Sequence, residues 1–243
     1  MSANANETLL AHHFENMEQQ KDANLLGMWM FLSTEIMFFG GIFGAYAVYR
    51  QRCADGFVMG SELLWVWLGA LNTAILIGSS LTMALAVRAA HLGKPAGLGV
   101  FGWLVATIIM GFAFLGVKGI EWTEDYREGL IPIPGLWHPE EAVAHKVHEK
   151  HEADVAAGRK DVHHAPVNLN HMKIFFSLYF AMTGLHALHM LIGFGILGTL
   201  TYYAWYGAYN PKYYTPVEIA GLYWHFVDII WVFLFPLLYL IRH

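Results

Sequence analysis

Five ionisable side chains lie inside apolar stretches of this sequence, where a charged group is costly. Glu35 lies in FLSTEIMFF, His186 and His189 in TGLHALHML, and His225 and Asp228 in YWHFVDIIW. An ionisable side chain at mid-membrane depth costs about 2.5–3.5 kcal/mol on insertion scales, so we expect all five to point into protein or toward a partner. None of these stretches contains a lysine or arginine that would balance a carboxylate. The five residues are therefore the candidates for chemistry.

Four of these residues form two pairs with helical spacing. His186 and His189 are three residues apart, as are His225 and Asp228, and such residues share one face of a helix. We predict a polar network that joins the two stretches, formed by His186, His189, His225 and Asp228. Haem ligation is the alternative. A membrane cytochrome with two stacked haems presents histidine pairs several turns apart on each of two helices, and this sequence has no such pair, so packing histidines are favoured.

Glu35 is the carboxyl with the most apolar surroundings. Ser33 and Thr34 offer hydroxyl groups, but no basic residue lies within two helical turns on either side. Because burial disfavours the charged form of a carboxyl, we expect Glu35 to be protonated at neutral pH. The alternative is a Glu35 that pairs with a donor on a neighbouring subunit.

Three other polar residues lie near the ends of apolar stretches. Thr215 precedes Pro216 and stands three residues before Glu218, which is the spacing of a capping box with proline in the first turn. We therefore expect Thr215 and Glu218 to cap a helix near the membrane interface. Glu121 follows the third stretch, and we expect it at a helix end or an interface as well. No catalytic residue and no metal ligand is predicted.

The apolar stretches themselves define the expected fold. Each is long enough to cross a bilayer as a helix, which takes about 20 residues, and they cover about 25–49, 63–87, 97–117, 174–206 and 217–241. Three connections are short and contain glycine or proline, so successive helices should be antiparallel neighbours. The sequence therefore predicts an all-α polytopic membrane protein, a bundle of five transmembrane helices in a single domain over 1–243.

The overall composition agrees with this class. Of the 243 residues, 56% are hydrophobic and 14% are charged, which is outside the range of ordinary soluble domains. The net charge of −5 argues against a nucleic-acid partner. Cys53 is the single cysteine, which excludes a disulfide within the chain. The polar segment 1–24 lacks the pattern of a signal peptide, so we expect the first span to direct insertion.

One connection, from about Trp122 to Met172, is long, hydrophilic and rich in histidine. Its seven histidines are His138, His145, His148, His151, His163, His164 and His171. A metal site is one interpretation, but no cysteine or finger spacing accompanies these histidines. A solvated loop with a short amphipathic helix is favoured. Loops of this length within a compact domain are usually functional or disordered, so we expect a role in contacting a partner.

Several motifs in these stretches resemble subunit III of the haem–copper terminal oxidases, in particular of cytochrome c oxidase. They are FLSTEIMFFGGIF around Glu35, LNTAILIGSS from Leu71, KGIEWTEDY around Glu121, TGLHALHMLIG around His186 and YWHFVDIIWVFLF around His225. The resemblance covers all five stretches. Longer members of the family have seven helices in two bundles with a lipid-filled cleft between them, and this chain matches the last five.

The resemblance implies an accessory subunit of an oxidoreductase without an active site of its own. Such a subunit binds no haem or copper, which lie in partner subunits. It packs against subunits I and II and a small subunit IV, binds phospholipid, and supports proton uptake and the stability of the active site during oxygen reduction. It also implies a bacterial inner membrane, a cytoplasmic amino terminus, and a proton-related role for Glu35. The long loop has no counterpart in the resemblance, and we expect it to contact an electron-donor complex.

The sequence also allows other functions and the opposite orientation. The alternative functions are subunit III of a related quinol oxidase, a b-type membrane cytochrome, and a transporter of ions or protons. Five spans do not divide into equal inverted halves, which argues against the transporter. With the amino terminus inside, ten of the 14 basic residues lie outside, so the positive-inside count favours the opposite orientation. Many of the ten lie in the long loop, where that rule is weak, and we adopt the orientation of the family.

Overall fold

The computed structural model describes residues 14–93, 99–156, 168–209, 211 and 213–241. The helices in these ranges are α2 (Met17–Arg52), α3 (Ala54–Leu63), α4 (Val66–Leu92), α5 (Gly99–Arg127), α6 (Glu140–Ala156), α7 (Leu169–Trp205) and α8 (Thr215–Tyr239). Five of them, α2, α4, α5, α7 and α8, are long and apolar enough to cross a membrane. The predicted all-α bundle of five such helices is confirmed.

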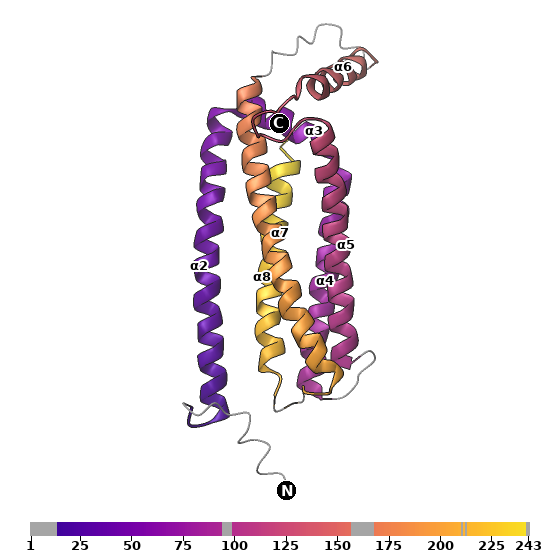
Figure 1. Cartoon of the computed structure of the whole chain (residues 1–243). Coiled ribbons are helices and arrows are strands. Elements are labelled where there is room, and N and C mark those ends of the chain that lie inside the picture. The colour runs from indigo at the N-terminus through magenta and orange to yellow at the C-terminus, as the bar shows by residue number, and fades with distance from the viewer. Residues whose placement is uncertain (1–13, 94–98, 157–167, 210, 212, 242–243) are drawn as a thin grey trace.

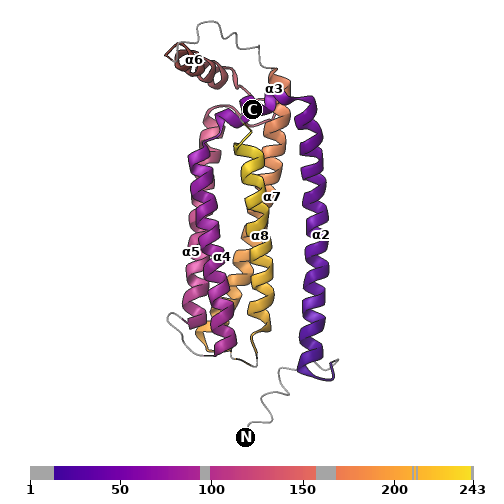
Figure 2. The same ribbon diagram turned by 180° about the vertical axis from the view of Figure 1, so that it is seen from behind.

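The five long helices run up and down between two ends of an elongated bundle (Figure 1). Helices α7 and α8 occupy the middle, α4 and α5 pack together on one side, and α2 stands on the other side, as the reverse view also shows (Figure 2). The short helices α3 and α6 lie at the end that carries the carboxyl terminus, and the amino terminus lies at the opposite end. Helix α2 is peripheral, since only 11% of its most apolar window is buried, against 56% for α8.

Local sequence signals account for several helix ends. Asn16 caps α2 by accepting a hydrogen bond from the backbone N–H of Gln19 at 2.8 Å. Gly93 ends α4 in a left-handed conformation, with φ of 59°, and glycine adopts that conformation without strain. Because α2 begins at Met17, the predicted polar segment 1–24 is partly helical, and its residues 1–13 lie outside the described residues.

Two helices extend further into the predicted long loop than hydropathy indicated. Helix α5 continues to Arg127, ten residues beyond the predicted end, and α7 begins at Leu169, five residues before the predicted start. Within the loop, α6 is the predicted short helix, with Val143 and Val147 packed against the core. The stretch 157–167, with His163 and His164, lies outside the described residues.

The core is closely packed where Trp224 of α8 is fully buried between neighbouring helices. A Cβ at Gly193 of α7 would lie 2.8 Å from the Trp224 ring, and one at Gly111 of α5 would lie 3.1 Å from it. The indole N–H donates a hydrogen bond to the Ser79 hydroxyl of α4 at 2.9 Å. The two glycines therefore make room for a ring that joins α8 to α4, α5 and α7.

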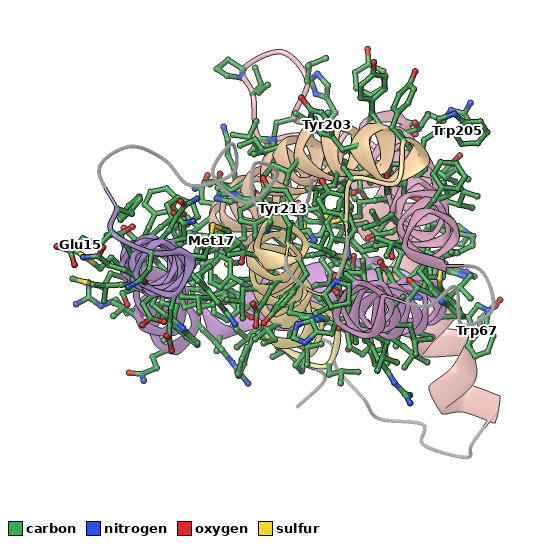
Figure 3. The ribbon with its side chains drawn as sticks, turned by 90° about the horizontal axis from the view of Figure 1, so that it is seen from below. Glu15, Met17, Trp67, Tyr203, Trp205 and Tyr213 are labelled. Atoms are coloured by element: carbon green, nitrogen blue, oxygen red, sulfur yellow. The ribbon has the colours of Figure 1, made fainter. Side chains whose placement is uncertain are left out.

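Aromatic side chains surround the bundle near its ends. Seen from below in Figure 3, Trp205 and Trp67 point outward from the bundle, and their exposed fractions are 69% and 79%. Trp and Tyr at helix ends are typical of the membrane interface.

Candidate functional site

Glu35 and His189 form a pair between α2 and α7, halfway along both helices. The Oε2 atom of Glu35 lies 3.2 Å from Nε2 of His189. The pair is largely enclosed, with side-chain exposures of 20% and 11%. The Phe39 ring packs on His189 with centroids 5.2 Å apart, and the Tyr223 hydroxyl donates to the backbone carbonyl of His189 at 3.0 Å. The structure therefore joins two of the predicted residues, from the first and fourth spans.

The other ring nitrogen of His189 determines how many protons this pair holds. Nδ1 lies 2.8 Å from the carbonyl oxygen of Leu185. A carbonyl oxygen only accepts, so Nδ1 must carry a hydrogen. Nε2 then either accepts a hydrogen from a protonated Glu35 or donates its own to an ionised one. In both cases one proton is shared and the pair has no net charge.

An apolar groove runs between α2 and α8. It has a volume of about 890 Å³, and it is lined by Leu32, Phe39, Phe43, Phe226, Ile230 and Phe233, among other residues. Arg50 and Gln51 line the same groove at the end of α2 where α3 follows. The groove thus combines a long apolar surface with one cationic end.

His186 lies in the core and makes no polar contact with the other predicted residues. Its ring packs against Phe114 and Trp231, with centroids 5.4 and 5.2 Å away. Neither ring nitrogen has a hydrogen-bond partner among the residues that the structure describes. His186 is thus an aromatic core residue of α7 in this arrangement.

His225 and Asp228 face α4 rather than α7. Nδ1 of His225 lies 2.7 Å from the Ser80 hydroxyl, and His225, Asp228 and Ser80 line one small pocket. Neither carboxyl oxygen of Asp228 has a hydrogen-bond partner in the described part of the chain. The four residues predicted as one network are therefore divided among separate contacts, with His189 bonded to α2 and His225 bonded to α4.

The predicted capping box at the start of α8 does not form. Thr215 is the first helical residue and the N-cap is Tyr214, so within the described residues no side chain caps this end. The Glu218 carboxylate instead lies 3.6 Å from the Lys21 ammonium, which also donates to the Tyr214 hydroxyl at 2.8 Å. Glu218 therefore ties α8 to α2. The prediction failed because α8 begins at Thr215 itself, whereas a capping box requires Thr215 to be the residue just before the helix.

We expected Glu121 at a helix end or an interface, and it lies buried in the last turns of α5 at the centre of a polar cluster. Glu121 pairs with Lys118 of the same helix and accepts hydrogen bonds from Tyr179 of α7 and Tyr239 of α8. Tyr179 also contacts Asp125 of α5. Sequence reasoning missed the other four residues, because hydropathy ended the third span at residue 117. The signal was the spacing, since Lys118, Glu121 and Asp125 lie on one helix face.

Outside the membrane-spanning helices, Asp55 and His171 link α3 to the start of α7. Their Oδ1 and Nδ1 atoms are 2.7 Å apart. Among the described residues, no three histidine, cysteine or acidic side chains are arranged to hold a metal ion. The loop histidines His138 and His145 line a surface pocket together with Glu128 and Lys146.

These features define a polytopic membrane protein whose interior holds ionisable pairs and whose surface carries an apolar groove. Residues 160–242 match the family described as cytochrome c oxidase subunit III. The chain is 30% identical over 228 residues to quinol oxidase subunit 3 of Bacillus subtilis strain 168. The aligned region covers 92% of this chain and 91% of that protein.

Two further relatives extend the comparison to other oxidases. Cytochrome c oxidase subunit 3 of Thermostichus vulcanus is 29% identical over 229 residues, covering 93% of this chain and 92% of that protein. Cytochrome bo(3) ubiquinol oxidase subunit 3 of Pseudomonas aeruginosa is 25% identical over 231 residues, covering 95% of this chain and 91% of that protein. The chain belongs to the subunit III family of the haem–copper terminal oxidases.

Proposed function

We propose that this chain is a non-catalytic subunit of a proton-pumping haem–copper oxidase, and that it binds phospholipid beside the catalytic subunit. The observation that carries the proposal is the groove between α2 and α8. Its apolar walls suit acyl chains, and the Arg50 guanidinium at one end suits a phosphate headgroup. Haem and copper belong to the partner subunits I and II, and a small subunit IV completes the complex.

Filling the groove tests its role as a lipid site. Gly40 lines the groove, and a Cβ built there meets no atom within 4 Å, so Gly40→Leu adds bulk without a clash inside the chain. The purified complex of this variant should retain fewer phospholipid molecules, as counted by native mass spectrometry. Gly44→Leu is the matched control, because Gly44 has equally open space on the same helix and does not line the groove. Equal lipid retention in both variants would contradict the proposal.

Glu35 supports the proton-related part of this function. The pair with His189 places a shared proton at mid-membrane depth, next to a second apolar pocket that Glu35 and His189 line together with Met28, Ile192 and Ile196. The shared proton leaves the pair without net charge, which suits a role in sustaining proton uptake by the partner subunits.

The orientation and the partner of the long loop complete the proposal. The amino terminus lies on the cytoplasmic side of a bacterial inner membrane, and α3, α6 and the carboxyl terminus lie on the outer side. Helix α6 then contacts a neighbouring subunit or an electron-donor complex. Deleting Glu140–Lys160 should weaken assembly with that partner more than it slows turnover of the isolated oxidase, and equal assembly after deletion would count against this contact.

The names of the relatives mention two electron donors, which are cytochrome c for some relatives and quinol for others. We place this chain with the cytochrome c oxidases on its motifs and keep a quinol oxidase as the second candidate. Mass spectrometry of the complex that co-purifies with the chain tests the choice, because it identifies the catalytic subunit and any attached donor.

A further inference from the structure

The polar cluster around Glu121 lies toward the end of the bundle that carries α3 and α6, where α5, α7 and α8 meet. Lys118, Glu121 and Asp125 come from α5, and Tyr179 and Tyr239 come from α7 and α8. All five are buried, with exposed fractions between 0% and 5%. Such a group of ionisable side chains is stable in the interior only if its charges and hydrogen bonds are satisfied within it.

The Lys118 ammonium donates hydrogen bonds to two phenol groups of the cluster and forms an ion pair with a third group. Nζ lies 3.0 Å from the Tyr179 hydroxyl and 2.6 Å from the Tyr239 hydroxyl, and it donates to both. It also forms an ion pair with Glu121, at 3.1 Å from Oε2. An ammonium has three hydrogens and no acceptor, so both phenol oxygens accept from Lys118 and keep one hydrogen each to donate.

The hydrogens of the two phenols do not suffice for the contacts that they make. Tyr239 donates to Oε1 of Glu121. The Tyr179 oxygen lies 2.8 Å from Oε1 of Glu121 and 3.2 Å from Oδ2 of Asp125. One hydroxyl hydrogen cannot make two full hydrogen bonds to two carboxylates, and a hydrogen on one of the carboxyl groups satisfies the second contact.

The geometry decides which carboxyl carries this hydrogen. Glu121 has the shorter contact with Tyr179, accepts from Tyr239, and pairs with Lys118, as expected of an ionised carboxylate. Asp125 has only the longer contact with Tyr179, which fits an O–H group that donates to the phenol oxygen.

Charge balance leads to the same assignment. Lys118 contributes one positive charge, and two ionised carboxylates would leave a net negative charge in the interior. A further charged group that acts on Asp125 is Glu128, which has the same sign, while Arg127 is engaged by Glu124 on the surface. The titratable groups that face Asp125 are thus Lys118, Glu121, Tyr179, Tyr239 and Glu128. With one proton on Asp125 the buried cluster is neutral.

We propose that this cluster is a proton-binding site, in which Asp125 holds one exchangeable proton at neutral pH between the Lys118–Glu121 ion pair and the aqueous phase at the end of the bundle that carries α3 and α6. The site is independent of the Glu35–His189 pair, which lies halfway along other helices. It is also independent of whether the groove between α2 and α8 binds phospholipid. It does not depend on the identity of the electron donor.

Infrared spectroscopy of the intact complex in H₂O and D₂O tests the proposal. The wild type should show a carboxylic acid C=O band from Asp125 that shifts on deuteration, and Asp125→Asn should lose the intensity of one carboxyl group. The asparagine amide is nearly isosteric and can still donate to Tyr179, so the variant should keep its place in the complex. Glu124→Gln is the matched control, since Glu124 is an exposed neighbour on the same helix and should leave the band unchanged.

A second variant tests which group accepts the hydrogen bond from the Asp125 proton. Tyr179→Phe removes the acceptor of the Asp125 O–H group, so the band should move to higher frequency without losing intensity. The assignment is overturned if Asp125→Asn leaves the spectrum unchanged, or if the band disappears in Glu121→Gln and persists in Asp125→Asn.

Discussion

Glu35 and His189 show how a carboxyl and an imidazole can lie inside a membrane without a net charge. The Leu185 carbonyl fixes a hydrogen on Nδ1 of His189, so Nε2 and Glu35 share one further proton. The sequence alone predicted a protonated Glu35 from its apolar surroundings. It did not predict this partner, because His189 lies 154 residues further along the chain.

The state of Glu35 is tested by its reactivity. A neutral carboxyl in an apolar setting reacts with a lipid-soluble carbodiimide, and we expect the adduct at Glu35 in the intact complex. Glu35→Gln should abolish the adduct yet keep the subunit assembled, because the amide can donate to Nε2 of His189. Glu218→Gln, at a carboxylate paired with Lys21, serves as the control and should not reduce labelling. An infrared carboxylate band that vanishes in Glu35→Gln would show that the pair is ionised instead.

Asp55 should give the complex a small pH-dependent stability. Burial alone raises the pKa of its carboxyl, but hydrogen bonds from His171 and from the backbone N–H of Gly56 together lower it on balance. A carboxyl whose pKa is lowered by folding stabilises the native state above its unfolded pKa of about 3.9, and the stabilisation is lost as the pH falls through the folded pKa.

Replacing Asp55 measures this contribution. Asp55→Asn should lower the free energy of unfolding by about 0.2–1 kcal/mol at pH 7, because the pair is partly exposed and screened by solvent. The difference in the free energy of unfolding between Asp55→Asn and the wild type should become smaller below about pH 4. Thermal release of the subunit from the complex, recorded between pH 7 and pH 4, provides the measurement. Asp22→Asn, at an exposed position on α2, should show no such trend.

At the scale of the helices, α8 is held by close contacts that only glycine permits. Gly193→Ala places a Cβ 2.8 Å from the Trp224 ring, and overpacking of this kind costs about 1–3 kcal/mol. The variant should therefore release the subunit at lower temperature. Gly195→Ala, two residues further along α7 with no atom within 4 Å of the new Cβ, is the control and should be neutral or slightly stabilising. If Gly193→Ala and Gly195→Ala changed the release temperature equally, the close contact at Gly193 would not be what stabilises α8.

Helix α5 shows where sequence reasoning about elements succeeded and where it stopped. Its apolar part was predicted, because about 20 apolar residues are sufficient evidence for a span. Its last turns, from Lys118 to Arg127, were left out of the predicted span, since a lysine and several carboxylates normally end a span. They continue the helix because Tyr179 and Tyr239 satisfy those groups from α7 and α8. Such distant partners are not visible in a single sequence.

The predicted polar network was wrong because it depended on how the helices pack. Spacing along one helix correctly placed His225 and Asp228 together, since both line one pocket beside Ser80. His186 and His189 have the same spacing, but His186 packs against Phe114 and Trp231 whereas His189 contacts Glu35. Which neighbouring helix each face contacts depends on the packing of the whole bundle. The bundle turns His189 toward α2 and His225 toward α4.

In the molecule as a whole, much of the apolar surface is left uncovered by the part of the chain that the structure describes. Helix α2 exposes Trp29, Met30, Ile36, Met37 and Phe38, each at half or more of its surface. We expect the chain to be stable only beside a multi-helix partner. Expressed alone, it should aggregate or be degraded, and size-exclusion chromatography in detergent measures this. Co-expression with the catalytic subunit is the control, and recovery of a monodisperse isolated chain would argue against this dependence.

The contact between Glu35 and His189 also has a consequence for synthesis. Translation proceeds at about 5–20 residues per second, and 154 residues separate the two side chains. Glu35 thus enters the membrane roughly 8–30 s before its partner has been made. During that interval α2 lacks α7 and α8, the two long helices against which it packs, and a carboxyl that takes up a proton can remain in the membrane at lower cost than an ionised one. The timing of translation therefore selects the neutral form of Glu35 before the fold that later shelters it exists.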